Sequence, residues 1–207
     1  MIELRLRFRR SVLIAVPVLS WLTASAQAQW TITPQLGMNF AGDVEFRRGG
    51  PGASAGYFGK RVGFEVEFQR YQHFFKDSEI VPLDPAAPPN CTGGQGGIPC
   101  KDINTDARSL MGNVVVRLRP AATKWHLYAT AGLGLMHAWT NEEGRQQDDL
   151  AWSVGGGVLY SFRKRAALRG DLRYGHGFAD ANATAGVYYK DYGFWRVTLG
   201  LTFGSLR

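Results

Sequence analysis

Acidic and basic side chains recur at every second position in parts of this 207-residue chain, and they are the first candidates for chemistry. Glu65 and Glu67 form an acidic pair, while Arg169, Asp171 and Arg173 form a mixed group. Carboxylates at positions i and i+2 without a substrate cleft do not give the geometry of a glycosidase, in which two carboxyl groups flank the scissile bond. Carboxylates that face guanidinium groups would instead form charge-assisted hydrogen bonds. The pattern therefore favours ion pairing over acid–base catalysis.

The four histidines do not complete the constellation of a lipid hydrolase. Such an enzyme needs a histidine beside a serine nucleophile and a carboxylate that orients the histidine. No serine lies two residues after His73, His126, His137 or His176, and the residue at that distance from His176 is Phe178. A lipid-modifying enzyme is therefore the least favoured alternative, and we expect the protein not to be an enzyme.

Cys91 and Cys100 are the two cysteines of the chain, and a glycine-rich segment separates them. In an oxidising compartment, two cysteines in one loop indicate a disulfide. A zinc site is the alternative, but neither a second cysteine pair nor a nearby histidine completes four ligands. The segment Asp102–Asp106 resembles the start of a calcium loop but lacks the glycine and glutamate needed at its sixth and twelfth positions. We expect a Cys91–Cys100 disulfide and no metal or cofactor.

The first 28 residues have the organisation of a secretory signal peptide. Four arginines precede an apolar stretch over 11–22, and Ala26-Gln27-Ala28 supplies the small residues of a cleavage site. The apolar stretch is too short to span a bilayer as a helix, and it contains Pro17. Cleavage removes four arginines and one glutamate, which lowers the net charge from +7 to +4. We predict a signal peptide over 1–28 and a mature domain over 29–207.

The mature chain alternates between apolar and polar residues, as a β-strand with two different faces does. Between Trp30 and Phe40 the apolar residues fall on even positions, and between Trp195 and Phe203 they fall on odd positions. No amphipathic helix of useful length is expected in the mature chain. The same alternation predicts eight strands at about 30–40, 53–58, 62–69, 110–119, 125–135, 152–162, 168–174 and 195–203.

The lengths of the connections distinguish a membrane barrel from a soluble sandwich. Strict alternation of short and long connections, with an even number of strands of about ten residues, is typical of transmembrane barrels. Short links are expected at 59–61, 120–124 and 163–165, and longer ones at about 41–52, 76–107, 140–149 and 179–191.

The basic excess does not indicate nucleic-acid binding. The short links contain six basic residues, so the positive charge is spread over one rim of the expected barrel. It does not form a run of the kind that tracks a phosphate backbone. Nucleic acid is therefore not an expected partner.

Aromatic residues share the parity of the apolar faces and predict two girdles around a lipid band. The girdle near the short links comprises Trp30, Trp125, Phe162 and Phe203. The girdle near the long links comprises Phe40, Phe74, Trp139, Trp152, Tyr174 and Trp195.

Three stretches make the sequence similar to a known family: Met111–Leu118, Gly155–Tyr174 with its Arg163–Arg165 turn, and Phe194–Phe203. With the alternating pattern, they make residues 29–207 resemble the OmpA-like eight-stranded outer-membrane β-barrels. The resemblance implies an all-β, antiparallel, up-and-down barrel in the bacterial outer membrane, with extracellular loops and periplasmic termini. It also implies that the barrel-assembly machinery recognises the C-terminal strand. The long form of that family adds a peptidoglycan-binding domain, which is not expected here.

Eight strands leave an interior just wide enough for side chains to fill. Two interpretations of its polar residues remain open, a structural ion-paired plug and the gated ion path of a small pore or transporter; the narrow barrel favours the plug. We therefore expect a monomeric, non-enzymatic barrel that acts in envelope integrity and contacts outer-membrane lipid, lipopolysaccharide or surface ligands through four loops. The inward parity holds Tyr128 and the charged residues Glu65, Glu67, Arg117, Arg119, Arg169, Asp171, Arg173 and Arg196.

Overall fold

The computed structural model describes residues 29–46, 49–75, 105–118, 124–140, 146–178 and 191–204. Within these residues, no helix is both long and apolar enough to cross a membrane. Eight strands make up nearly all of the described chain: β1 (Gln29–Gly42), β2 (Gly49–Phe58), β3 (Val62–Tyr71), β4 (Thr105–Arg117), β5 (Trp125–Thr140), β6 (Gln146–Arg163), β7 (Ala166–Phe178) and β8 (Tyr192–Gly204).

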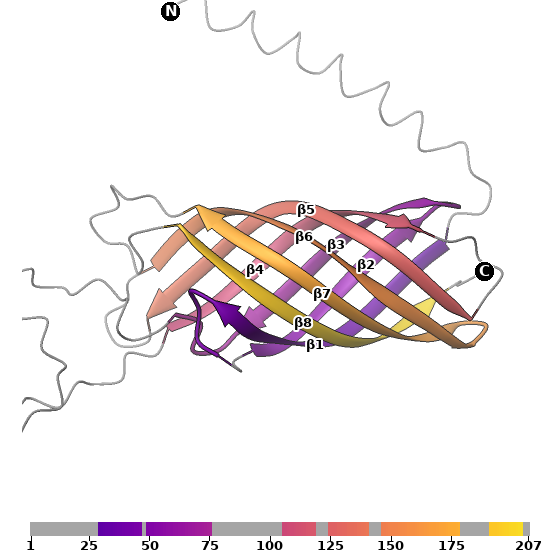
Figure 1. The fold of residues 1–207 in the computed structure, drawn as a ribbon, viewed down its shortest axis with the longest axis horizontal. Helices are drawn as coiled ribbons and strands as arrows, with labels where there is room; N and C mark the ends of the chain where they lie inside the picture. The colour runs from indigo at the N-terminus through magenta and orange to yellow at the C-terminus, as the bar shows by residue number, and fades with distance from the viewer. Residues whose placement is uncertain are drawn as a thin grey trace, which may run out of the picture.

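The eight strands form one closed antiparallel barrel in which each strand pairs with its neighbours along the chain (Figure 1). β1 and β8 close the ring through a ladder that runs from Thr31 opposite Gly204 to Gly42 opposite Phe194. Closure pairs the backbone N–H and C=O groups of both edge strands, as a lipid-exposed sheet requires. The predicted fold, an eight-stranded up-and-down barrel, is confirmed.

Successive side chains along the strands point alternately into the barrel and away from it. In β1, Gln35 is 5% exposed, whereas its neighbour Leu36 is 67% exposed. In β3, Glu65 and Glu67 are buried, whereas Val66 between them is 56% exposed. A soluble protein has the opposite distribution, because buried charges and exposed large apolar surfaces are unfavourable in water. The distribution fits a barrel with a lipid-facing outside and a polar inside.

The strands extend further than predicted at the end of the barrel where the longer connections lie. Trp139 pairs with Gln146, so the connection between β5 and β6 spans only 141–145. The connection between β4 and β5 spans 118–124, and the alternation of long and short connections is therefore less strict than predicted. β3 ends and β4 begins at the expected end of the barrel, which is on the left in Figure 1, and the residues between them, 72–104, form the longest connection in the sequence.

Three predictions lie outside the described residues. They are the signal peptide over 1–28, the disulfide between Cys91 and Cys100, and the inward orientation of Arg119. All three remain predictions from the sequence.

Candidate functional site in the barrel interior

Inward-facing charged side chains from β3 and β7 meet in the middle of the barrel. Arg169 donates from Nη2 to Glu65 Oε1 at 3.1 Å and from Nε to Asp171 Oδ2 at 2.8 Å, and its Nη1 also bonds Glu65. The Tyr128 hydroxyl of β5 donates to Asp171 Oδ1 at 2.6 Å and accepts from Arg169 Nε at 2.8 Å. Each charged group in this half of the network therefore has a partner of opposite charge, which limits the cost of burying it.

Arg173 of β7 connects this half of the network to a second half around Glu67. Its Nη1 lies 2.9 Å from Glu67 Oε2, and its Nη2 lies 3.3 Å from Glu65 Oε1. Glu67 also bonds Arg196 of β8, whose Nη1 donates to the Tyr71 hydroxyl at 2.6 Å. The network thus crosses the lumen and joins side chains from β3, β5, β7 and β8.

The charges of this network balance. None of the six ionised side chains is more than 6% exposed. Because each charge faces one of opposite sign, their attraction offsets part of the cost of removing them from water. The network by itself carries no net charge. It consists of three carboxylates and three guanidinium groups, those of Glu65, Glu67, Asp171, Arg169, Arg173 and Arg196.

Arg117, also predicted to face inward, stands apart from the network. Its guanidinium lies 5.4 Å from the ring centroid of Phe58, near the end of the barrel with the short connections. Arg119 lies outside the described residues. Among the described residues, a cavity of ≈ 30 Å³ lies beside Arg117 and another of ≈ 20 Å³ beside Tyr71. Each has room for no more than a few water molecules.

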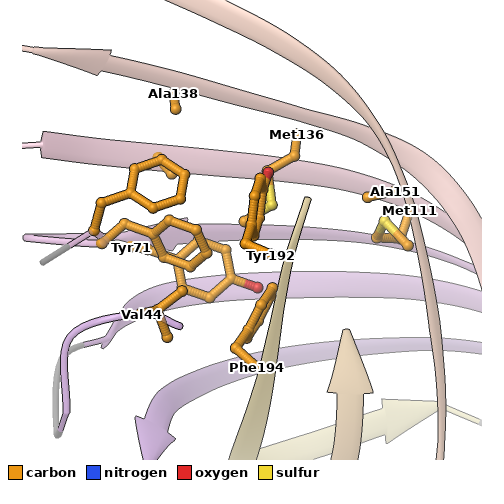
Figure 2. Packing of buried hydrophobic residues seen from close by; sticks show 11 residues of the cluster. Val44, Tyr71, Met111, Met136, Ala138, Ala151, Tyr192 and Phe194 are labelled. Carbon is orange, nitrogen blue, oxygen red and sulfur yellow. The ribbon is translucent and has the colours of Figure 1, made fainter. Parts of the chain in front are cut away.

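A cluster of apolar and aromatic side chains, here called the mouth cluster, closes the barrel toward the longer connections (Figure 2). In Figure 2, Tyr71 of β3 and Tyr192 and Phe194 of β8 project into the same space. Phe74 and Phe75 are 0% and 1% exposed, and their ring centroids are 4.9 Å apart. The mouth cluster consists of Val44, Tyr71, Phe74, Phe75, Ala107, Met111, Met136, Ala138, Ala151, Tyr192 and Phe194.

The prediction that Phe74 faces lipid in an aromatic girdle is wrong. The side-chain parity of a strand holds only while the strand continues, and β3 ends at Tyr71. His73 adopts a φ of 50°, which is the left-handed region that non-glycine residues seldom occupy. After this turn, the Phe74 N–H donates to the Thr105 carbonyl at 2.6 Å, and the Phe74 ring lies inside the barrel.

The connection between β1 and β2 also packs over the mouth. Glu45 donates its N–H to the Phe74 carbonyl at 2.9 Å, and Val44 forms an isolated β-bridge with Phe75. Asp43 Oδ2 accepts the Gly193 N–H at 2.9 Å. These bonds hold residues 43–46 and 72–75 against the mouth cluster.

The other residues predicted as girdles lie on the outward face, in two groups. Toward the longer connections, the Trp152 and Tyr174 ring centroids are 5.7 Å apart, and those of Tyr174 and Trp195 are 5.4 Å apart. Trp139 and Phe40 lie on the outward side of the same end. The group toward the short connections consists of Trp30, Trp125, Phe162 and Phe203, all exposed.

The outer surface carries one histidine–carboxylate pair within hydrogen-bond distance among the described residues. His137 Nδ1 lies 2.6 Å from Asp148 Oδ1. The outward neighbours of His137 are Arg108 across the strands and Leu135 and Trp139 on its own strand, and none supplies a hydroxyl or thiol. Within the same described ranges, no three His, Cys, Asp or Glu side chains gather as metal ligands would.

The sequence pattern missed two interior features. The mouth cluster depends on the turn at His73, which parity does not reveal. Asp149 is buried and accepts from Gln147 Nε2 at 2.8 Å and from the Tyr192 hydroxyl at 3.0 Å. Asp149 has the same parity as the inward-facing Ser153 of β6, so a longer predicted strand would have included it on the inner face. The sequence pattern instead assigns Asp149 to the connection at 140–149.

The closed sheet, the apolar outer surface and the polar filled lumen define the class of outer-membrane β-barrels. The chain matches the family model described as outer membrane protein beta-barrel domain over residues 11–203, and it belongs to that family. Family membership assigns it to the bacterial outer membrane, and the resemblance to small eight-stranded barrels is confirmed.

Solved structures with the same fold are distant in sequence. Neisserial surface protein A (NspA) has a TM-score of 0.51 and 17% identity, with 85% of this chain and 94% of that chain covered. The N-terminal β-barrel domain of OprF from Pseudomonas aeruginosa has a TM-score of 0.52 and 16% identity, with 86% of this chain and 99% of that chain covered. A comparison with curated proteins gave no significant match. At these identities the likeness concerns the fold alone.

Proposed function

We propose that this protein is a non-conducting, non-enzymatic barrel that acts in envelope integrity and in surface or ligand interaction through the connections at the mouth-cluster end. The observation that carries the proposal is the obstruction of the lumen at two levels. The ion-paired network fills the middle, and the mouth cluster fills the end. A lumen without continuous water is suited to presenting loops on a rigid support, since binding residues are often carried by loops on such scaffolds.

The proposal includes an orientation. The long 72–104 connection and the mouth cluster face the exterior, and the short connections with Lys60, Lys124 and Arg163–Arg165 face the periplasm. Transmembrane barrels generally have short periplasmic turns and longer extracellular loops, which supports this choice. An epitope inserted in 141–145 is then accessible to antibody on intact cells, and one inserted in 59–61 only after permeabilisation. The reverse result would overturn the orientation.

The proposed partners follow from this placement. The barrel-assembly machinery recognises β8, which ends in the aromatic Phe203 before Gly204. Lipopolysaccharide and surface ligands contact the exterior end, and the barrel acts as a monomer. The absence of a nucleophile beside His137 supports a non-enzymatic role for the described surface.

Planar-bilayer recording tests the closed lumen. We expect no reproducible single-channel steps from the wild type, because the network would have to break before an ion could pass. Arg173→Ala removes the link between the two halves of the network and is expected to increase leak events. Lys60→Ala removes a positive charge from an exposed turn and serves as the control. Reproducible wild-type steps whose size changes in Arg173→Ala would favour the pore alternative and overturn the plug.

A further inference from the structure

The outward face of β3 to β6 carries a row of basic and acidic residues, here called the charged row, at the mouth-cluster end. In the register of the sheet, Arg70 lies opposite Arg108, Arg108 opposite His137, and His137 opposite Asp148. Like charges directly opposite each other on neighbouring strands destabilise a sheet. The Arg70–Arg108 pair is therefore a place where an anion would bind favourably.

This row lies where the apolar band of the outer surface ends. One step closer to the middle of the barrel, the outward residues of the same strands are all apolar and exposed. The apolar outward residues of β5 run from Trp125 to Leu135, close to the 9–11 residues that a transmembrane strand needs. The charged row is thus at the level of the lipid headgroups. The apolar residues next to it are Phe68, Leu110, Leu135 and Leu150.

Arg108 is the basic residue of this row that forms no salt bridge with a carboxylate of the described residues. Arg70 Nη2 lies 3.2 Å from Asp106 Oδ2, and His137 pairs with Asp148. The Arg108 guanidinium lies 5.7 Å from the ring centroid of Trp139. A cation–π contact of this kind uses the face of the cation and leaves its N–H donors available to an anion.

A hollow of ≈ 440 Å³ lies on the same strands, closer to the middle of the membrane. Gly112 of β4, Ala131 of β5 and Trp152 of β6 line it. Gly112 is four residues from Arg108 along β4, about 13 Å at the rise of a strand. A Cβ at Gly112 would meet only the Leu133 carbonyl oxygen, at 3.8 Å, so packing does not require glycine there. The small residue leaves room on the lipid face for an acyl chain.

We propose that the outward face of β4–β6 binds one molecule of lipid A, the phosphorylated lipid of the outer leaflet. Its phosphate accepts hydrogen bonds from Arg108 and Arg70, and one of its acyl chains lies in the hollow over Gly112 and Ala131. The planar fork of guanidinium donors matches phosphate oxygens, which suits arginine to this role. The identification rests on the proposed function, because the proposed orientation places this rim in the outer leaflet.

Native mass spectrometry of the full mature protein in detergent, titrated with bisphosphorylated lipid A, tests this site. We expect one bound molecule for the wild type and roughly tenfold weaker binding for Arg108→Gln, which loses a charge-assisted hydrogen bond to phosphate. Dephosphorylated lipid A should bind the wild type more weakly than bisphosphorylated lipid A does. It should bind the wild type and Arg108→Gln equally well. Gly112→Leu fills the hollow and should weaken the binding of both lipids.

Two substitutions serve as matched controls. Lys60→Gln removes an exposed positive charge at the opposite rim. Gly170→Leu adds a side chain on the lipid face of β7, where a Cβ would meet only side-chain atoms at 3.6 Å or more. Both are expected to bind lipid A as the wild type does.

Several outcomes would overturn the proposal. They are equal binding by Arg108→Gln and the wild type, equal binding of phosphorylated and dephosphorylated lipid A, and equal binding of phosphatidylglycerol. Complete displacement of lipid A by inorganic phosphate would also overturn it, because a site for a small anion alone needs no acyl chain. None of these measurements depends on conductance or on orientation in a cell. A failure of this site is therefore distinguishable from a failure of the closed barrel or of the orientation.

Discussion

Arg169 of β7 and Glu65 of β3 form an ion pair across the full width of the barrel, with Arg169 Nη2 and Glu65 Oε1 3.1 Å apart. β3 and β7 are four strands apart in either direction around the ring. Neither side chain is more than 4% exposed. The pair therefore links opposite walls of the barrel at a depth that bulk water does not reach.

Removing one partner of this pair should be costly. Arg169→Gln is expected to lower the free energy of unfolding by about 3–5 kcal/mol, because it leaves buried carboxylates without their closest positive charge. Urea unfolding of the protein refolded in lipid vesicles, followed by tryptophan fluorescence, measures the change. Arg117→Gln is the control, since Arg117 contacts the Phe58 ring and no carboxylate of the described chain, and its loss should be smaller.

The coupling between the two residues can be measured separately. In the double variant Glu65→Gln with Arg169→Gln, the loss of stability should be smaller than the two single losses combined, by about 0.5–3 kcal/mol. Strictly additive losses would contradict an energetic link between β3 and β7 through this pair.

Most of the barrel follows from side-chain alternation, because a regular strand between lipid and a polar lumen fixes the face of every residue. The parity of Glu65 and Arg169 alone predicts that both face the lumen. Ion pairing in general follows from the residue types, but which carboxylate pairs with which guanidinium group does not, since it depends on how the closed sheet brings β3 opposite β7. The alternation predicts the wrong face for Phe74 because the turn at His73 interrupts the strand. Tertiary contacts with Thr105 and Phe194 determine where the Phe74 ring lies.

The mouth cluster should contribute strongly to stability. Phe74→Ala is expected to lower the free energy of unfolding by about 3–5 kcal/mol, because it leaves a cavity among packed rings. Phe64→Ala is the matched control: Phe64 faces outward, where lipid fills the space of a truncated side chain. The same vesicle-unfolding assay compares the two variants. A loss in Phe64→Ala as large as that in Phe74→Ala would contradict the mouth cluster as a packed core.

The predicted disulfide between Cys91 and Cys100 can be tested by peptide mapping. Proteolysis of the oxidised, unalkylated protein should give a linked peptide that reduction separates or shifts in mass. Cys91→Ser should leave Cys100 reactive toward a thiol reagent in the unfolded protein, whereas the wild type should not react before reduction. Reaction of both cysteines in the unreduced wild type would show that the bond does not form.

Gly157 and Gly170 provide a test of the filled lumen, because they lie on paired strands and face opposite sides of the sheet. A Cβ at Gly157 would lie 2.4 Å from the Gly170 carbonyl oxygen and 2.4 Å from the Tyr128 hydroxyl, the group that donates to Asp171. A Cβ at Gly170 would meet only side-chain atoms, at 3.6 Å or more. Gly157→Ala is expected to lower the free energy of unfolding by about 1–3 kcal/mol, since the added methyl group must displace Tyr128 or the backbone. Gly170→Ala should leave stability unchanged or raise it by about 0.5–1 kcal/mol, because glycine in a strand loses more conformational entropy than alanine on folding. Adding Tyr128→Phe to Gly157→Ala tests the share of the hydroxyl, because the ring Cζ would still lie 2.6 Å from the new Cβ. If the hydroxyl adds to the clash, alanine at 157 should cost less stability beside phenylalanine than beside tyrosine. Equal stability of Gly157→Ala and Gly170→Ala would mean that the lumen has spare room at this level, and the plug would then be looser than its hydrogen bonds indicate.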